Sequence, residues 1–451
     1  MQGNVKNLKI SILGASRSGI AAAKLLKNRG ADVFVSELAK EKEMESAASV
    51  LKNSGITAEF GGHSSRVFNC DFCVISPGIS INSDIAVNFK ERNIPVYSEL
   101  EVASWFIKGK IIAVTGSNGK STVTSLTGEI LKSAGLDAYV AGNIGTPLSS
   151  VADKITQNDY AVVEVSSFQL EAVDRFKPDT GIFLNLTPDH LNRHGTMEEY
   201  GRLKALLFKN QTRDDAAIYY GDSQIVNKLM SDCSGNKFEF GLKNKEKRAG
   251  FVEDGILTCI INEEKYSLLH INELGIKGEH NVLNAIAASL AALVNKVEPA
   301  AVESALKTFK GLQHRMEFIG EVNGVKWYND SKATNVDSVI YALNSFSEPV
   351  VLIAGGRDKD SDFTLLKEPV KKHVKELIVI GEAAQKIERA LNDVTDIYRA
   401  STMQDAVNKA SKSAEHGDVV LLSPACASFD MFENFEHRGD VFRTLFRKIE
   451  L

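Results

Sequence analysis

The stretch Ile111–Thr122, which reads IIAVTGSNGKST, decides how the rest of the chain is interpreted. Its first four residues are β-branched or apolar and predict a buried strand. The turn Gly116–Gly119 ends that strand, and Lys120 opens a helix-like run that continues to Ala134. A strand, a glycine-rich turn and a helix that starts with lysine and hydroxyl residues form a phosphate cradle, in which backbone N–H groups face the anion. We therefore predict nucleotide binding here.

Two side chains of this loop have predicted roles. Lys120 would reach the terminal phosphates, and Ser121 would bind Mg²⁺. The loop is a shortened form of the usual motif, because Val114 stands where a full Walker A sequence has glycine. The alternative is a plain strand-to-helix turn that binds no ligand. The order Gly-Lys-Ser-Thr at a helix start is unusual for such a turn, and it favours the phosphate site.

Composition limits the classes of function. The 451 residues suffice for about three domains, and 43% hydrophobic with 25% charged residues is typical of a soluble protein. A net charge of −5 argues against a general binder of nucleic acids or membrane surfaces. No apolar run approaches the ~20 residues of a membrane span. Five cysteines indicate a reducing compartment, so we expect a cytoplasmic location. The CxxC pair Cys70 and Cys73 is expected to pack in the core.

Strand-like and helix-like runs alternate along almost the whole chain, which predicts an α/β fold with mostly parallel sheets. We expect three domains, at residues 1–108, 109–311 and 312–451. The first and third are expected to be Rossmann-like, and the second to be a P-loop-type ATPase domain. The region from about Ala216 to His270 has shorter strands and turns, and it is a candidate for an antiparallel addition.

Polar residues follow several predicted strands, at the sheet edge where α/β folds bind ligands. Gly14–Gly19 with Glu37 resembles a dinucleotide fingerprint, but Ser16 replaces its central glycine, so nucleotide binding and plain packing stay equally open on this motif. Glu164 ends the apolar run Tyr160–Val163 and suits a Walker B role toward Mg²⁺. The alternative for Glu164 is a solvated carboxylate at a strand end.

Three further residues, each in a different segment, carry predictions of their own. His190 follows a third strand of the central unit, and we favour a metal or phosphate contact over a structural role. Lys204 lies in the helical run Met197–Asn210 and alone predicts only a solvated lysine. Near Mg²⁺ an ammonium would be repelled, so Lys204 would help only when neutral or converted by CO₂ to a carbamate. Cys426 is expected to be a small packed thiol, since no histidine motif points to it.

Taken together, these motifs resemble those of the Mur ligase family, from about Lys9 to Arg447. The resemblance rests on Thr115–Thr122, Thr187–His190, Gly278–Asn281, His314–Arg315 and Asn329–Asn335. Within the family, the members that add D-glutamate are similar at Glu164–Glu171, Leu422–Ser428 and Asn434–Gly439. The resemblance implies that ATP phosphorylates the carboxylate of UDP-N-acetylmuramoyl-L-alanine, and that the amine of D-glutamate then attacks the acyl phosphate. This is a step of peptidoglycan precursor synthesis.

The resemblance also implies roles for individual positions. Residues matching the ATP site are Gly116, Ser117, Asn118, Gly119, Lys120, Ser121, Thr122, Asn281, Asn284, Arg315 and Asp330. Two Mg²⁺ ions would be held, directly or through water, by Ser121, Glu164, His190 and carbamylated Lys204. Lys332 would contact the transferred phosphoryl group. The pocket for D-glutamate would include Thr334, Lys359, Ser428 and Phe435. The diphosphate of UDP would contact Gly78 and Asn143, and the uracil would lie at Ser18 and Glu37. The partners implied are these substrates, without nucleic acid, and a monomer is expected.

The N-terminal match departs from the family in one detail. Glu37–Ala39 lacks the Asp-Thr-Arg type of sequence that is typical there. Other specificities within the family, for L-glutamate, a diamino acid or the glutamate tail of folate, are the nearest alternatives. A nicotinamide oxidoreductase built on Gly14–Gly19 and a P-loop switch or motor are alternatives of other classes. Ser16 argues against the former, and the polar third domain argues against the latter.

Overall fold

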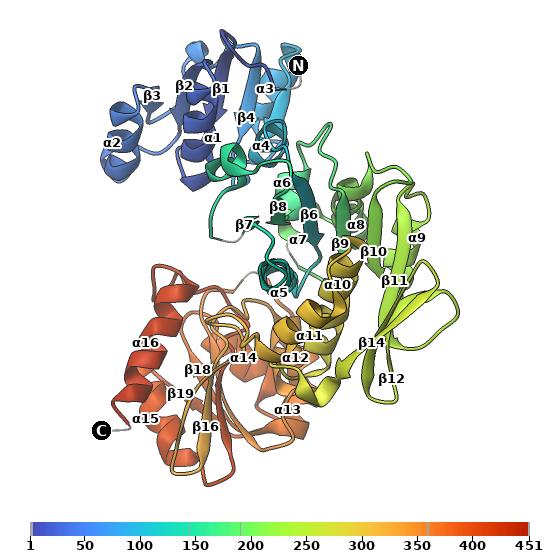
Figure 1. The fold of residues 1–451 in the computed structure, drawn as a ribbon. Coiled ribbons are helices and arrows are strands. Elements are labelled where there is room, and N and C mark those ends of the chain that lie inside the picture. The colour runs from blue at the N-terminus through green and yellow to red at the C-terminus, as the bar shows by residue number, and fades with distance from the viewer. Residues whose placement is uncertain (1–2, 144, 190, 359, 450–451) are drawn as a thin grey trace. The chain divides into compact units, whose positions relative to one another are not determined.

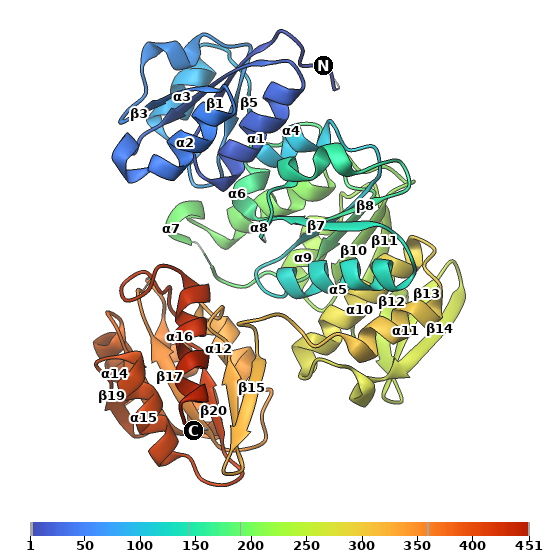
Figure 2. The same cartoon turned by 60° about the vertical axis from the view of Figure 1, so that its left-hand side comes forward.

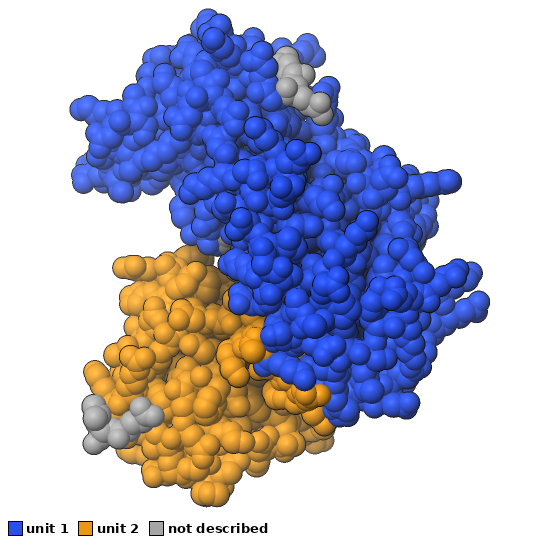
Figure 3. Space-filling model, in the orientation of Figure 1, with its two compact units in different colours: residues 1–186, 198–271, 283–307 blue, residues 187–197, 272–282, 308–451 orange. Residues whose placement is uncertain are grey.

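The computed structural model describes residues 3–143, 145–189, 191–358 and 360–449, which form three β-sheets flanked by helices (Figure 1). Residue contacts divide the chain into two compact units (Figure 3). Unit 1 consists of Met1–Leu186, Glu198–Ile271 and Leu283–Lys307, and unit 2 of Thr187–Met197, Asn272–Val282 and Thr308–Leu451. Within the described ranges, no helix is both long and apolar enough to cross a bilayer.

The N-terminal sheet of unit 1 is entirely parallel, with the strand order β3-β2-β1-β4-β5. This matches the first five strands of the Rossmann order 3-2-1-4-5-6, in which ligands bind at the carboxyl ends of the central strands. The strands are β1 (Lys9–Leu13), β2 (Asp32–Glu37), β3 (Thr57–Phe60), β4 (Phe72–Ile75) and β5 (Val96–Ser98), and the helices are α1 (Arg17–Asn28), α2 (Glu45–Asn53), α3 (Asp84–Glu91) and α4 (Glu99–Ser104). The prediction of a Rossmann-like first sheet is confirmed, although β3 was not predicted because its residues are mostly half-buried.

The central sheet of unit 1 has nine strands in the order β14-β13-β12-β11-β10-β9-β6-β8-β7. Pairing is parallel from β7 to β12 and antiparallel from β12 to β14, as suggested for this region. The strands are β6 (Lys110–Thr115), β7 (Ala138–Gly142), β8 (Tyr160–Glu164), β9 (Thr180–Phe183), β10 (Ala216–Tyr220), β11 (Asn236–Lys243), β12 (Arg248–Glu253), β13 (Ile256–Ile261) and β14 (Glu264–His270). Because β6 is central, Ile112, Ala113 and Val114 are completely buried, as its apolar sequence predicts.

Three helices of the central segment lie on predicted helical runs: α5 (Lys120–Ser133), α8 (Met197–Ala205), which ends before the expected Asn210, and α10 (Glu279–Val294). The helices α6 (Ser167–Leu170), α9 (Gln224–Met230) and α11 (Pro299–Thr308), and α7 (Leu191–His194) in unit 2, were not predicted. The Ala- and Leu-rich α10 passes from unit 2 into unit 1 at Leu283. Its residues Ala285–Ala292 are fully buried, which explains a helix that is apolar on nearly every face.

Buried carboxylates join the two sheets of unit 1. Glu101 of α4 is completely buried and accepts hydrogen bonds from the backbone N–H groups of Asp174 (3.0 Å) and Phe176 (2.8 Å). The indole N–H of Trp105 donates to the same carboxylate at 2.8 Å. Ser149 N donates to Glu99 at 2.6 Å, and burial raises the pKa of Glu99. Such a junction is costly to open, because each N–H would lose a charged acceptor.

The sheet of unit 2 has the order β15-β16-β20-β17-β18-β19 and is parallel except for the β15–β16 hairpin. Its strands are β15 (Glu317–Val322), β16 (Val325–Asn329), β17 (Val350–Gly355), β18 (Val374–Ile380), β19 (Ile397–Arg399) and β20 (Val419–Leu422). Its helices are α12 (Val336–Leu343), α13 (Lys367–His373), α14 (Ala384–Leu391), α15 (Met403–Ser413) and α16 (Phe435–Arg447). Helix α16 packs against β16, and Figure 2 shows α16 lying across this sheet, between the labels of β17 and β15. The edge strands β15 and β19 were not predicted, since neither forms a buried apolar run.

Candidate active site

The phosphate loop leaves β6 at Thr115 and enters α5 at Lys120. Gly119, the residue before the helix, has a φ of 83°, in the left-handed region that glycine adopts without strain. A Cβ atom at this position would lie 2.4 Å from Asn284 Oδ1 of α10. Both the backbone conformation and the close approach of Asn284 therefore require glycine at this position.

Asn185 holds the loop in shape from the end of the neighbouring strand β9. Its Oδ1 accepts hydrogen bonds from Ser117 N (3.0 Å) and Asn118 N (2.8 Å), and its Nδ2 donates to Asn118 O (3.1 Å). Sequence reasoning gave Asn185 no role. The available signal was its position directly before Thr187–His190, after a strand adjacent to β6.

Two lysines gather at one carbonyl of the loop. Lys120 Nζ donates to Gly116 O (2.9 Å) and Ser117 O (2.7 Å). Lys204 Nζ, brought in by α8, donates to the same Gly116 O at 2.8 Å. Lys204 is 1% exposed, and its Nζ lies 4.3 Å from the centre of the Tyr200 ring. The structure thus brings the end of the Lys204 side chain to the phosphate loop, although its helical surroundings predicted only a solvated lysine. The Lys120 ammonium makes this loop attractive to phosphate.

Oxygen ligands suitable for Mg²⁺ lie beside the loop. Ser121 Oγ donates to Glu164 Oε2 at 2.5 Å, and Asn143 Nδ2 donates to Glu164 Oε1 at 2.7 Å. Glu164 ends β8 and is 3% exposed. The described residues contain no cluster of three or more His, Cys, Asp or Glu side chains that could hold a metal ion. A hydroxyl and one carboxylate fit Mg²⁺, which commonly fills its other positions with water and phosphate oxygens.

The other predicted ligands of the central segment are distributed as follows. Asn284 is buried in α10 next to Gly119. Asn281, one turn earlier in the same helix, lies in unit 2, where its Nδ2 donates to Lys277 O at 2.8 Å. His190 and Lys359 lie outside the described residues, so their predicted roles have no structural counterpart here.

The N-terminal sheet places its predicted ligands on loops at strand ends. Ser18 is half-buried in the first turn of α1, and Gly78 follows β4 with open space where a Cβ would stand. The carboxylate of Glu37 accepts Ala15 N (2.6 Å) and Ala39 N (2.9 Å). Glu37 therefore holds its own loop to the loop after β1, in addition to any contact with a ligand. These loops share the edge where a Rossmann-like sheet binds nucleotides.

In unit 2, Asp330 directly follows β16 and is buried. Ser423 Oγ donates to Asp330 Oδ2 at 2.8 Å, and Met316 N donates to Oδ1 at 3.1 Å. Burial raises the pKa of Asp330 to about 7, against the opposing effects of these hydrogen bonds and of the nearby Arg315. The carboxyl group is thus poised to change its charge near neutral pH.

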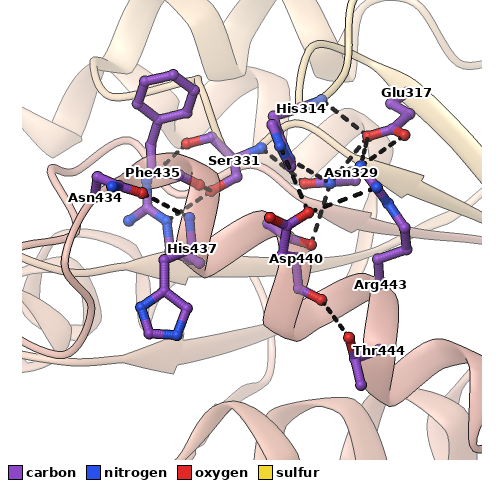
Figure 4. A network of polar contacts seen from close by, with 12 residues as sticks. His314, Glu317, Asn329, Ser331, Asn434, Phe435, His437, Asp440, Arg443 and Thr444 are labelled. Atoms are coloured by element: carbon purple, nitrogen blue, oxygen red, sulfur yellow. Dashed lines mark hydrogen bonds and ion pairs between the residues drawn. The ribbon is translucent and has the colours of Figure 1, made fainter.

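A polar network connects Asp330's strand to helix α16 (Figure 4). Asn329 Nδ2 lies 2.9 Å from His314 Nδ1, and His314 N donates to Glu317 at 2.9 Å. Arg443 of α16 donates to the same Glu317 at 3.0 Å. A Cβ at Gly439 would lie 2.2 Å from His314 Nδ1, so the glycine allows the helix to approach. Burial lowers the pKa of His314, which favours its neutral form.

Arg438 is a structural centre of this unit that sequence reasoning missed. It is 1% exposed, and it donates to the carbonyls of Ser331 (2.7 Å) and Cys426 (3.1 Å). Burial lowers the pKa of Arg438 to about 10. Burial likewise raises the pKa of the Cys426 thiol to about 12, as expected for a packed cysteine. The position of Arg438 in the Asn434–Gly439 motif was the signal that the sequence offered.

The side chains expected around the amino acid are brought to connected elements of unit 2. Lys332 Nζ lies 3.7 Å from the centre of the Phe435 ring, at the start of α16. Ser428 is buried, and Ser428 O accepts Phe432 N at 2.9 Å. Thr334 lies between Lys332 and Asn335, the residue that caps α12. The end of β16, the Ser423–Ser428 loop and the start of α16 therefore converge through Arg438.

Three family models match consecutive parts of the chain. They describe the MurD N-terminal domain at residues 9–85, the Mur ligase middle domain at residues 114–292, and the Mur ligase glutamate ligase domain at residues 314–426. A UDP-N-acetylmuramoylalanine–D-glutamate ligase of Chloroherpeton thalassium is 41% identical, over 97% of this chain and 98% of that protein. The chain belongs to the Mur ligase family. A Salinibacter ruber protein of the same name is 42% identical, over 98% of each chain.

Solved structures of other Mur ligases and related enzymes share the fold. A pseudomurein peptide ligase type C from Methanothermus fervidus matches 98% of this chain and 100% of its own, with a TM-score of 0.63 and 21% identity. The UDP-N-acetylmuramate–alanine ligase MurC from Thermotoga maritima matches the same shares, with a TM-score of 0.63 and 19% identity. The three-domain α/β fold predicted from the sequence is therefore confirmed. As a Mur ligase, the chain is an ATP-dependent enzyme that uses Mg²⁺.

Proposed function

We propose that this Mur ligase forms an amide bond between UDP-N-acetylmuramoyl-L-alanine and D-glutamate, with hydrolysis of ATP to ADP and phosphate, in peptidoglycan precursor synthesis. The observation that carries this proposal is identity of 41–42% with D-glutamate ligases over nearly the full length of both chains. The geometry of the phosphate loop supports it independently. A loop shaped by Asn185 and carrying Lys120 is suited to the phosphates of ATP.

The reaction proceeds in two steps. A carboxylate oxygen of the alanyl group attacks the γ-phosphorus of ATP, the bond to the β-phosphate oxygen breaks, and ADP leaves. The amine of D-glutamate then attacks the carbonyl carbon of the acyl phosphate, loses a proton, and expels phosphate from the tetrahedral intermediate. Phosphoryl transfer of this kind depends on positioning and on neutralising charge more than on covalent help from the protein.

The phosphate loop supplies most of that charge neutralisation. Backbone N–H groups at the start of α5 face the phosphates, and Lys120 turns from its carbonyl partners to the γ-phosphate. Lys332, from the loop after β16, contacts the phosphoryl group during transfer. Its position against the Phe435 ring restricts the directions in which the ammonium can reach. Asn281, Asn284, Arg315 and Asp330 complete the contacts to ATP.

Ser121, Glu164, His190 and carbamylated Lys204 would hold two Mg²⁺ ions, directly or through water. Bound there, Mg²⁺ supplies positive charge to the phosphate oxygens. Lys204 serves as a carbamate, which replaces a buried ammonium beside a cation by an anionic oxygen ligand. Support for this assignment comes from its burial and from its approach to Gly116 O in the loop.

The remaining substrates divide between the two units. Ser18 and Glu37 lie at the uracil, and Gly78 and Asn143 lie at the diphosphate. Thr334, Lys359, Ser428 and Phe435 form the pocket for D-glutamate. The domains extend over residues 1–108, 109–311 and 312–451, and they close when the substrates bind, because the groups that must meet lie on separate units. The enzyme acts as a monomer in the cytoplasm, where its five free cysteines stay reduced.

Mass spectrometry of the product tests the proposal. Purified protein is incubated with ATP, Mg²⁺, UDP-N-acetylmuramoyl-L-alanine and D-glutamate. The expected product is the nucleotide sugar extended by one glutamyl residue through an amide bond, formed in equal amount to ADP. ADP formed without this product would indicate an ATPase or another acceptor. Extension by a diamino acid in place of D-glutamate would move the enzyme to another branch of the family.

A further inference from the structure

A side-chain cluster in the N-terminal sheet has no role in the site described above. Ser36 of β2 and Glu59 of β3 meet His63 and Ser64, which lie in the loop after β3. Ser36 Oγ is 2.6 Å from Glu59 Oε1 and 2.7 Å from His63 Nδ1. Ser64 Oγ donates to Glu59 Oε2 at 2.6 Å. Ser36 is completely buried, whereas His63 is half-buried, so the imidazole connects the interior of the sheet to its surface.

The hydrogen bonds determine which ring nitrogen carries the proton. Burial alone would raise the pKa of Glu59, but hydrogen bonds from Ser36 and Ser64 lower it below its ordinary value, so the group is an ionised acceptor. Ser36 donates its single hydroxyl proton to Glu59, and its oxygen can then only accept from His63 Nδ1. In the neutral imidazole, Nε2 consequently has no proton and is a hydrogen-bond acceptor.

The loop that carries His63 is joined to the edge expected to bind the nucleotide base. Gly62 N donates to Glu37 O at 3.3 Å, and Gly61 N donates to Ala39 O at 2.8 Å. Both carboxylate oxygens of Glu37 already accept backbone N–H groups. His63 directly follows Gly62, so these backbone hydrogen bonds bring the segment that carries the imidazole beside the loop Glu37–Ala39.

We propose that His63 is a specificity-determining residue that selects uracil by accepting a hydrogen bond from the N3–H of the base at Nε2. This inference rests on the proposed function, which places a uridine nucleotide sugar at this sheet edge. Uracil presents a donor at N3, whereas cytosine presents a lone pair. With Nε2 fixed as an acceptor by Ser36 and Glu59, a cytidine nucleotide would place two lone pairs against each other. Sites that hydrogen-bond a substrate N–H strongly reject analogues that lack it.

Two substitutions of His63 separate this role from a structural one. In His63→Asn, the side-chain amide can still donate to Ser36 from near the Nδ1 position, but nothing occupies the position of Nε2. In His63→Gln, the longer side chain reaches that position with a carbonyl oxygen. His416→Asn is the matched control, because His416 is exposed in unit 2. Calorimetry measures the binding of UDP and of CDP to each full-length protein.

The proposal predicts that His63→Asn weakens UDP binding about tenfold, the worth of one hydrogen bond, whereas CDP binding is not weakened, because the substitution also removes the opposed lone pair. His63→Gln retains most of the UDP affinity, and the control equals the parent protein. In turnover, the KM for UDP-N-acetylmuramoyl-L-alanine rises in His63→Asn, while the KM for ATP is unchanged. Equal weakening of UDP and CDP would assign His63 a structural role only. Unchanged UDP affinity and KM in His63→Asn would also overturn the proposal.

The experiments distinguish failure of the proposed function from failure of the role of His63 alone. Absence of product and of UDP binding in the parent protein would remove the proposed function, and the role of His63 with it. A parent protein that forms the product, combined with a His63→Asn variant that discriminates UDP from CDP like the parent, would overturn only the role of His63.

Discussion

Ser121 Oγ lies 2.5 Å from Glu164 Oε2, although the two residues are 43 positions apart in the chain. The start of α5 and the end of β8 are thereby joined at the point where the sequence predicts a phosphate loop and a Walker B carboxylate. The other oxygen of Glu164 accepts Asn143 Nδ2 at 2.7 Å. Glu164 is thus oriented from both sides, as a carboxylate that must point at a metal ion requires.

Asn143→Ala is expected to weaken the response to Mg²⁺. The substitution removes the amide that orients Glu164, and loss of such a supporting group commonly costs about 10- to 100-fold in metal affinity or activity. The Mg²⁺ concentration at half-maximal activity should rise, whereas Asn158→Ala on the surface should behave like the parent. A change confined to the KM for the UDP-sugar would instead assign Asn143 to the diphosphate alone.

Much of this arrangement was predictable from the sequence. The apolar run of β6 and the order Gly-Lys-Ser-Thr gave the loop, because strand burial and glycine conformation are local properties. The partners of the loop were less accessible. Asn185 and Lys204 reach it through the order of β9 beside β6 and through the packing of α8, and both are tertiary facts. The edge strands β3, β15 and β19 escaped prediction because half-buried strands lack a clear apolar pattern.

Lys204→Ala should lose nearly all activity and be partly rescued by short carboxylates such as acetate. The alanine leaves space near Gly116 O, in which a carboxylate can replace the oxygens of the proposed carbamate. Lys209→Ala, five residues later and exposed, is the matched control and should need no rescue. Full activity of Lys204→Ala without added carboxylate would refute the modified lysine.

Asp330→Asn should stabilise unit 2 more at pH 8 than at pH 5. Between an unfolded pKa of 3.8 and a folded pKa of about 7, the folded state keeps a proton that the unfolded chain has released. Stability from this group is therefore complete below the lower value and is lost as the pH rises through the upper one. The whole loss of stability, from below the lower pKa to above the upper one, is about 4 kcal/mol. Asparagine is neutral at every pH, so Asp330→Asn does not lose stability in this way as the pH rises.

Tryptophan fluorescence during urea unfolding can measure this effect. The chain has two tryptophans, and Trp327 is buried in the core of unit 2. With Trp105→Phe as the background, Trp327 reports on that unit alone. The midpoint difference between Asp330→Asn and its background should grow from pH 5 to pH 8. A difference that is constant with pH would contradict the raised pKa of Asp330.

Glu101→Gln is expected to destabilise unit 1. The carboxylate accepts several backbone N–H groups and the Trp105 indole, and an amide would turn a donor toward some of them. Loss of hydrogen bonds to a buried charge costs on the order of 2–3 kcal/mol each, so the melting temperature should fall by several degrees. Glu129→Gln on the exposed face of α5 is the control. Equal melting temperatures for both variants would show that Glu101 does not hold the junction.

The central claim is that the enzyme couples ATP to the addition of D-glutamate. Its most direct test is phosphate release by the purified protein with ATP, Mg²⁺ and UDP-N-acetylmuramoyl-L-alanine, with each glutamate enantiomer added in turn. The account predicts phosphate release that depends on D-glutamate, is negligible with L-glutamate, and is abolished in Lys120→Ala. Release that depends on L-glutamate, or that is the same with and without an amino acid, would contradict it.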